Sequence, residues 1–275
     1  MNRKLSDLCL KSIGYLFNII TVLAIIYMLI PLLVVVISSF NSTGHIKLPP
    51  TELSLDWYKK LFSDTSYIKA ILNSTLLAAL ATVISAVLGI CTALALCRGS
   101  LPASNAISTL LLSPLILPNI AIGVALLQYA SMMGVPRSYT ILLAGHVVIC
   151  TPYIVRLLLA SLKTSGIDLE EASHDLGAGA LTTFRHVTLP QIKPALIAGS
   201  LFAFVISWVN VELSIFNVPL NEELLPIKIF NYVQYTVDPL IAAVSAITIY
   251  IAIFVILSID MIIGIDRFAL RDQNE

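Results

Sequence analysis

The sequence predicts an all-α integral membrane protein with six transmembrane helices. Its 275 residues are 58% hydrophobic and 12% charged, with a mean hydropathy of +0.93, whereas about a quarter of the residues of an average soluble domain are charged. The chain also contains six apolar segments of about 20 residues or more, the length that a helix needs to cross a bilayer. These segments are Ile13–Phe40, Ala70–Cys97, Asn105–Ser131, Tyr139–Leu162, Pro194–Pro219 and Pro239–Ile265.

The charge distribution predicts the sidedness of the chain. Its net charge is zero and no block of like charge occurs, so the sequence offers no electrostatic surface for nucleic acid. An even number of spans puts both termini on one side of the membrane. Lysine and arginine are somewhat more frequent in the loops on the side of the N-terminus, so the positive-inside rule predicts that both termini are cytoplasmic.

Three regions follow from the apolar segments. Residues 1–69 comprise the first span and an external loop, residues 70–265 form the core transmembrane domain, and residues 266–275 form a cytoplasmic tail. Within the external loop, the apolar side chains of residues 54–62 (SLDWYKKLF) share one helical face, which is typical of a helix at the membrane interface. A docking surface for an external protein is the other interpretation of this segment.

The polar loop between the fourth and fifth apolar segments has internal order. About seven ionised residues occur in roughly thirty between Lys163 and Lys193, in contrast to the apolar segments on either side. Asp168 and Glu171 have the spacing of a capping box, and Gly177 stands where a helix would end. The loop therefore predicts a helix of about two turns, Leu169–Leu176, which is too short to be stable without a packing partner.

A second short helix is expected after the glycine. Thr182 or Thr183 would cap it, and it would extend through Arg185 and Val187. Pro190 and Pro194 would then close the loop and start the next span. The expected order is helix, glycine turn and helix.

The loop resembles the EAA loop of the permease subunits of binding-protein-dependent ABC importers. That pattern is EAA, three residues, G, nine residues, I, one residue and LP, and the chain has Glu171-Ala172-Ser173, then Gly177, then Val187-Thr188-Leu189-Pro190 at the same spacing. Ser173 replaces the second alanine and Val187 replaces isoleucine. The motif covers about twenty residues, and its place between the fourth and fifth of six spans agrees with the type I permease fold of that family.

The resemblance implies that Leu169–Leu176 is a coupling helix that sits in a cleft of a cytoplasmic ATPase subunit. Glu171 would make polar contacts, Ala172 would permit close approach, and Gly177 would allow the turn. The whole coupling set would be Glu170, Glu171, Ala172, Ser173, Asp175, Gly177, Arg185, Leu189 and Pro190. The alternative is a loop helix that only seals the inner face of the helix bundle.

The resemblance also implies the partners and the location. We expect two copies of an ABC ATPase, a second homologous permease, an external solute-binding protein and a bacterial cytoplasmic (inner) membrane. None of the twelve glycines precedes a lysine, so the chain lacks the GxxxxGK loop that cradles phosphates. ATP and magnesium would therefore belong to the ATPase, and this chain would bind no cofactor and no metal.

Ionisable and amide residues in the apolar segments are the candidates for a solute path, because charge within a membrane is costly. Glu212 is expected inside the fifth span, where it would either line a route for a cation or make an interhelical hydrogen bond. Amides that line a path are hard to distinguish from amides that hold helices together. The full path set is Glu212, Asn210, Trp208, Gln128 and Asn119.

The substrate is the least determined property. Three stretches occur in the same order as in the spermidine/putrescine branch of these permeases, which the chain resembles: residues 57–62 (WYKKLF), 114–118 (PLILP) and 208–216 (WVNVELSIF). This resemblance makes a polyamine our expected solute. That branch often carries paired aspartates where this chain has Val209 and Asn210, with an acid at Glu212 instead. An aminophosphonate or an amino-acid-like solute therefore remains open.

Two other classes of function were weighed. An ion-coupled secondary carrier would need no ATPase and would follow a proton or sodium gradient by itself. An intramembrane enzyme would recruit His146, His174 and His186, but neither HExxH nor the Gly-x-Ser-x-Gly elbow occurs. We therefore expect a transport subunit that is not an enzyme.

Overall fold

A computed structural model describes residues 2–45, 48–50, 52–236 and 238–263, and helices account for most of them. An isolated bridge between Asn41 and Leu53 is the extended pairing found in this part of the chain. The helices are α1 Asn2–Ser38, α2 Asp56–Ser63, α3 Thr65–Arg98, α4 Ser104–Leu112, η1 Ser113–Leu115, α5 Asn119–Met132, α6 Tyr139–Ser165, α7 Asp168–Asp175, α8 Ala180–Thr183, η2 Phe184–Thr188, α9 Leu189–Val209, α10 Ser214–Asn217, α11 Leu225–Tyr235 and α12 Pro239–Ile263. The all-α prediction is confirmed for the described residues.

The chain divides into two compact units. One comprises residues 1–64 and 235–250, and the other comprises residues 65–234 and 251–275. In the first unit, the Ser39 hydroxyl lies 2.6 Å from the Tyr58 hydroxyl, and Leu61 of α2 is buried. Burial raises the pKa of Tyr58 to about 12. The predicted helix at residues 54–62 is confirmed as α2, while its position at the membrane interface stays a prediction.

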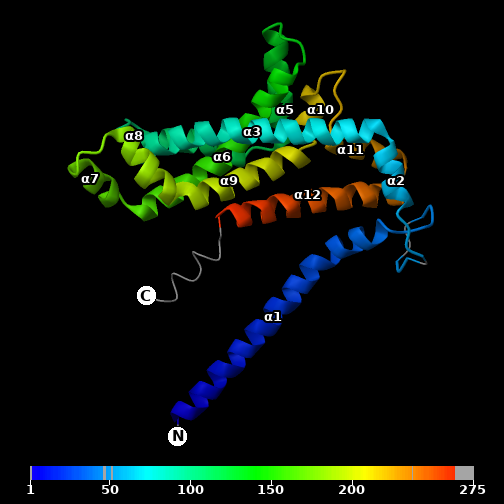
Figure 1. The fold of residues 1–275 in the computed structure, drawn as a ribbon, viewed down its shortest axis with the longest axis horizontal. Helices are drawn as coiled ribbons and strands as arrows, with labels where there is room; N and C mark the ends of the chain where they lie inside the picture. The colour runs from blue at the N-terminus through cyan, green and yellow to red at the C-terminus, as the bar shows by residue number, and fades with distance from the viewer. Residues whose placement is uncertain (1, 46–47, 51, 237, 264–275) are drawn as a thin grey trace. The chain divides into compact units, whose positions relative to one another are not determined.

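Three long helices, α3, α6 and α9, pack side by side at the centre of the second unit (Figure 1). Close packing is possible because the buried face of α3 carries small residues, a pattern that brings membrane helices together. A Cβ atom on Gly89 would lie 2.8 Å from Ile154 Cγ2, and one on Gly199 would lie 3.0 Å from Ile154 Cα. Both glycines therefore allow α6 to approach its two neighbours.

The two ends of this bundle carry different elements. Figure 1 shows α7 and α8 at one end and α11 at the other. At the α11 end, Asn73 donates to the Glu222 carboxylate at 2.7 Å, and Ser74 Oγ accepts from the Leu225 amide at 2.9 Å. These bonds attach the start of α11 to α3. The opposite end of the bundle carries the segment between α6 and α9, which contains α7 and α8 (Figure 1).

Four helical segments in the described part of the chain are long and apolar enough to cross a membrane. They are Gly14–Ser38, Thr65–Arg98, Tyr139–Ser165 and Ala180–Val209. A broken pair, Ser104–Leu115 with Asn119–Met132, makes a fifth if it counts as one span. The shorter apolar stretch Pro239–Val255 begins α12, and the last two residues of the sixth predicted span lie outside the described residues.

Two predicted spans differ from the structure. The segment Asn105–Ser131 bends by 101° between its two halves, because Pro114 and Pro118 lack amide protons and disfavour helix at the residue before them. The prediction of Pro194–Pro219 as one helix is wrong. Helix α9 starts before Pro194 and ends at Val209, and a turn separates it from α10.

Candidate functional site

The loop between α6 and α9, residues 166–188, is called the α7 loop here. Its first helix spans Asp168–Asp175, one residue earlier than predicted. Its carboxyl end is a Schellman motif, in which the Ala178 amide donates to Ser173 O at 3.1 Å and the Gly177 amide donates to His174 O at 2.8 Å. Gly177 has φ +86°, a left-handed conformation that glycine adopts without steric penalty. The predicted glycine stop is confirmed.

The predicted capping box at the start of this helix is wrong. Asp168 is the first helical residue, the residue before it is Ile167, and no side chain caps the helix. The backbone carbonyl of Ile167 instead accepts from the amides of Glu170 and Glu171. The three acids of the first turn still favour the helix, because negative charge is attracted to the positive amino end of the helix dipole.

The second half of the α7 loop also differs from the prediction. Gly179, rather than Thr182 or Thr183, precedes α8, and a π-helical turn over Phe184–Thr188 joins α8 to α9 without a break. Thr183 is buried, and its hydroxyl lies 2.9 Å from the hydroxyl of Ser173 on α7. The serine that departs from the EAA pattern thus makes a hydrogen bond that alanine cannot make, and the bond joins the two halves of the loop.

Glu170 points toward the bundle. Its carboxylate accepts from Arg98 Nε at 3.0 Å and from Arg98 Nη2 at 3.3 Å. Arg98 Nη2 also donates to the backbone carbonyls of Leu162 and Gly166 at the end of α6. Nothing in the sequence pairs Arg98 with a residue 72 positions away, so this contact was not predicted.

The other predicted coupling residues lie on the outer surface of the loop or at its edge. Glu171, Ala172, Asp175, Gly177, Arg185 and Pro190 are exposed, and Ser173 and Leu189 are half-buried. Large apolar side chains accompany them, since Leu176 is 89% exposed and Leu181 is 80% exposed. Exposed leucines and exposed acids on the same short loop make it suited to a protein partner.

The predicted path residues divide between structural and surface positions. Trp208 is buried and its indole N–H donates to Thr75 Oγ1 at 3.0 Å. Asn210 is buried and its Oδ1 accepts from the Leu213 amide at 2.9 Å, so it caps the turn before α10. Glu212 is exposed within that turn, and its predicted position inside a helix is wrong.

A buried histidine holds this turn against α6. His146 Nε2 lies 3.0 Å from Ser214 Oγ, and His146 Nδ1 lies 2.8 Å from Ser207 Oγ. Because Ser214 donates its own proton to Asn210 O at 2.7 Å, it must accept from the histidine, which places the ring proton on Nε2. Ser207 then donates to Nδ1. His146 therefore has two structural partners, which the sequence did not indicate.

Gly123 and Asn217 join the segment that follows α9 to α5. A Cβ atom on Gly123 would lie 2.9 Å from Leu213 Cα, so only glycine allows the turn to approach this closely. Asn217 is buried and donates to Gly123 O at 3.0 Å and to Leu213 O at 2.9 Å. These contacts fix the end of α9 on α5 and α6.

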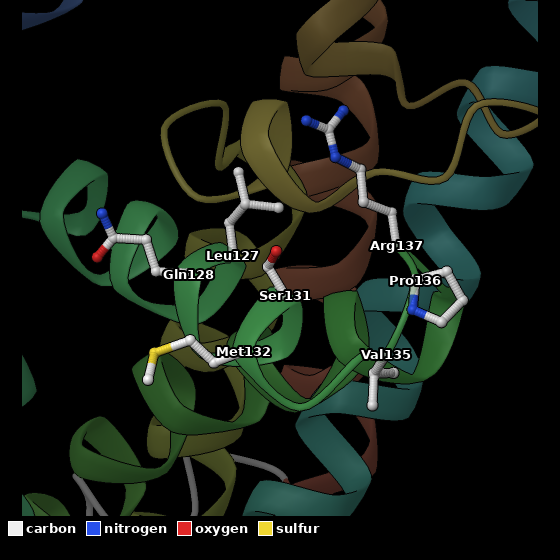
Figure 2. Close-up of a pocket in the computed structure, with 7 residues that line it drawn as sticks. All are labelled: Leu127, Gln128, Ser131, Met132, Val135, Pro136 and Arg137. Carbon is white, nitrogen blue, oxygen red and sulfur yellow. The ribbon is translucent and has the colours of Figure 1, made fainter.

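The two amide candidates lie on α5. Asn119 is its first residue and is half-buried, and Gln128 is exposed near its end. Gln128 lines an open hollow of about 700 Å³. Figure 2 shows the Gln128 and Arg137 side chains on opposite sides of this hollow, pointing away from each other. The hollow is lined by Leu127, Gln128, Ser131, Met132, Val135, Pro136 and Arg137. The other four path candidates do not line it.

The other two histidines considered for an enzyme, His174 and His186, bond within the α7 loop and not to His146. His174 Nδ1 lies 3.0 Å from Ala178 O, and His186 Nδ1 lies 3.0 Å from Thr182 O, each within the α7 loop. Over the described residues, no group of three or more His, Cys, Asp or Glu side chains could hold a metal ion. The three histidines thus do not form one site.

Comparisons with known proteins show which family the chain resembles. Residues 85–265 match the family described as the binding-protein-dependent transport system inner membrane component. The spermidine/putrescine transport system permease protein PotC of Haemophilus influenzae is 32% identical over 227 residues, which cover 82% of this chain and 88% of that protein. The putrescine transport system permease protein PotI of Escherichia coli is 32% identical over 234 residues, covering 82% and 83%.

A solved structure extends the comparison to the fold. It is a bacterial ABC transporter involved in the import of the acidic polysaccharide alginate, with a TM-score of 0.71, 16% identity, and coverage of 91% of this chain and 96% of that one. Membership of this family makes the chain a transport subunit and not an enzyme, and ATP hydrolysis is the task of a separate ATPase. The chain belongs to the family of binding-protein-dependent transport system inner membrane components and is a permease subunit of an ABC importer.

Proposed function

We propose that this permease imports a small organic cation of the polyamine class, which an external binding protein delivers. The relatives named for spermidine and putrescine support the solute class. Glu212 supports it chemically, because its exposed carboxylate lies beside an interruption in an apolar helix, and helix interruptions of this kind form solute sites in many transporters. Asn210 and Trp208 position that turn, while Gln128 and Asn119 contribute polar groups along α5.

The topology that fits this function has six spans and both termini in the cytoplasm. The four long helices, the bent pair of α4 and α5, and α12 would supply the six spans. The α7 loop would then follow the fourth span on the cytoplasmic side, where Lys163, Arg185 and Lys193 satisfy the positive-inside rule.

Within that topology, the α7 loop is the docking surface for the ATPase. The observation that carries this assignment is an exposed helix that ends in a Schellman motif and is followed by two exposed leucines, Leu176 and Leu181. Glu171 and Asp175 would make polar contacts with the ATPase, and Ala172 would permit close approach. The remaining members of the surface would be Ser173, Gly177, Arg185, Leu189 and Pro190.

The complete importer would contain this chain, a second homologous permease and two copies of the ATPase. ATP and magnesium would bind to the ATPase copies, and this chain would bind neither. When ATP brings the two ATPase copies together, the paired α7 helices of the two permeases would move with them and change the side from which the solute path is accessible.

Reversal of charge at Glu171 tests this function. In cells that express the complete importer, Glu171→Lys should reduce the ATP-dependent uptake of radiolabelled putrescine at least tenfold, since a loss of about 1.4 kcal/mol in docking weakens it tenfold. The chain should remain inserted, because Glu171 is exposed. Glu52→Lys, the same charge reversal at an exposed position in the loop at residues 39–64, should leave uptake unchanged.

Two outcomes would contradict different parts of the proposal. Wild-type uptake by Glu171→Lys would exclude the α7 loop as the docking surface. Uptake of an aminophosphonate or an amino acid in place of putrescine by the wild-type importer would exclude the polyamine class and leave the docking surface intact.

A further inference from the structure

One side chain at the end of α3 connects this helix to α6 and α7. Arg98 is the last residue of α3, and it donates to both carboxylate oxygens of Glu170 on α7. It also donates to Leu162 O and Gly166 O, which belong to the carboxyl end of α6. A planar guanidinium that binds a carboxylate through two nitrogens fixes orientation as well as distance.

The pair is shielded from water. The Arg98 side chain is 19% exposed and the Glu170 side chain 12% exposed, whereas both members of the Lys59–Asp56 pair on α2 are more than 70% exposed. A shielded charge that loses its partner is left without compensation, which makes the loss far more costly than at the surface. The Arg98–Glu170 contact therefore holds α7 more firmly than an exposed ion pair could.

The backbone alone would hold α7 less firmly than the backbone and these side chains do together. Gly166 with φ +67° joins it to α6, and Gly177 with φ +86° joins it to α8. Glycine at both ends gives the backbone freedom to turn. Side chains restrict this freedom through the Ser173–Thr183 hydroxyl pair, which connects α7 to α8, and through Glu170, which connects α7 to α3.

We propose that the Arg98–Glu170 pair transmits displacement of α7 to α3, so that ATP hydrolysis and opening of the solute path remain coupled. The inference rests on the proposed docking of the ATPase on the α7 loop. Force applied to the exposed face of α7 passes through Glu170 into α3, which packs against α6 and α9. Glu170 is thus a positioning residue within the permease and not a contact with the ATPase.

Charge exchange tests this role. The complete importer with Arg98→Glu or Glu170→Arg is reconstituted in liposomes, and the putrescine imported per ATP hydrolysed is measured. Each single variant should import roughly tenfold less solute per ATP, in line with the coupling energies that residues between two sites carry. Its ATPase rate should change about twofold at most, because the exposed face of α7 is unaltered. The double exchange, Arg98→Glu with Glu170→Arg, should recover most of the ratio.

A conservative variant and a second ion pair complete the design. Arg98→Lys should fall between the wild type and Arg98→Glu, because lysine is a point charge that cannot hold the carboxylate through two nitrogens. Glu223 and Lys228 form an ion pair of 2.9 Å at the α11 end of the bundle. Glu223→Gln should leave the solute imported per ATP unchanged.

Copurification of the ATPase measures whether each variant still assembles. If a single variant fails to assemble, the double exchange must restore both assembly and the transport ratio. A double exchange no better than the single variants, or single variants with the wild-type ratio, would overturn the inference while leaving the proposed function standing. Absence of ATP-dependent uptake in the wild type would overturn both.

Discussion

Two glycines in the α7 loop separate the effect of backbone conformation from the effect of side-chain space. Gly177 has φ +86°, whereas Gly179 has φ −72°. A Cβ atom on either would meet nothing within 4 Å in this chain. Substitution at Gly177 is therefore costly only through its left-handed backbone, and Gly179 is its natural control.

We predict that the tolerance of position 177 follows the left-handed propensity of the residue. Gly177→Asn should retain most uptake, Gly177→Ala should weaken the end of α7 by about 1 kcal/mol, and Gly177→Val by more, because β-branched residues are the least suited to positive φ. Gly179→Ala should behave as the wild type. The measurement is putrescine uptake at matched expression, and equal damage from Gly177→Ala and Gly179→Ala would refute the conformational explanation.

At the scale of elements, the regular helices followed from the sequence and their interruptions did not. The cores of α3 and α6 were predicted because their apolar residues continue without a proline pair or a polar break. The prediction continued the fifth helix through residues 210–217 (NVELSIFN), in which apolar and polar residues are mixed, yet α9 ends at Val209. Tertiary contacts from His146, Gly123 and Asn217 hold this turn. The local contribution is the Asn210 side chain, which accepts from the Leu213 amide.

The same distinction applies to the candidate site. The glycine turn at Gly177 is a local feature, and local spacing predicted it. The partner of Glu170 is distant in sequence, so the spacing that placed Glu170 in the coupling set could not reveal that it faces Arg98. Ser173 likewise differs only mildly from the motif in sequence, and its hydrogen bond to Thr183 is visible only in the structure.

We predict that the turn between α9 and α10 depends on Ser214. Ser214→Ala would leave both His146 Nε2 and Asn210 O without their partner in a buried position, at a cost of about 1–3 kcal/mol. The midpoint of thermal unfolding of the detergent-solubilised protein should fall by several degrees. Ser131→Ala removes an exposed hydroxyl at the end of α5 (Figure 2) and should leave the midpoint in place. A Ser214→Ala protein as stable as the wild type would show that the network is dispensable.

At the scale of the whole molecule, the sidedness of the membrane is what gives the α7 loop its role. The proposed docking of an ATPase requires that the α7 loop and the loop at residues 39–64 lie on opposite sides. Charge bias favours this arrangement by a modest margin, because several lysines also occur in the first loop. An independent readout of sidedness therefore tests the premise of both proposals together.

Two exposed glycines with open surroundings, Gly44 and Gly179, provide that readout. In spheroplasts that express this chain without its partners, Gly44→Cys should react with a membrane-impermeant maleimide added outside. Gly179→Cys should react only after the membrane is permeabilised, because its loop is expected in the cytoplasm. The parent chain, with its four native cysteines, supplies the background. The reverse pattern would place both termini outside. Labelling of both positions from outside would mean that an even number of spans separates them, whereas ATPase docking on the α7 loop depends on an odd number.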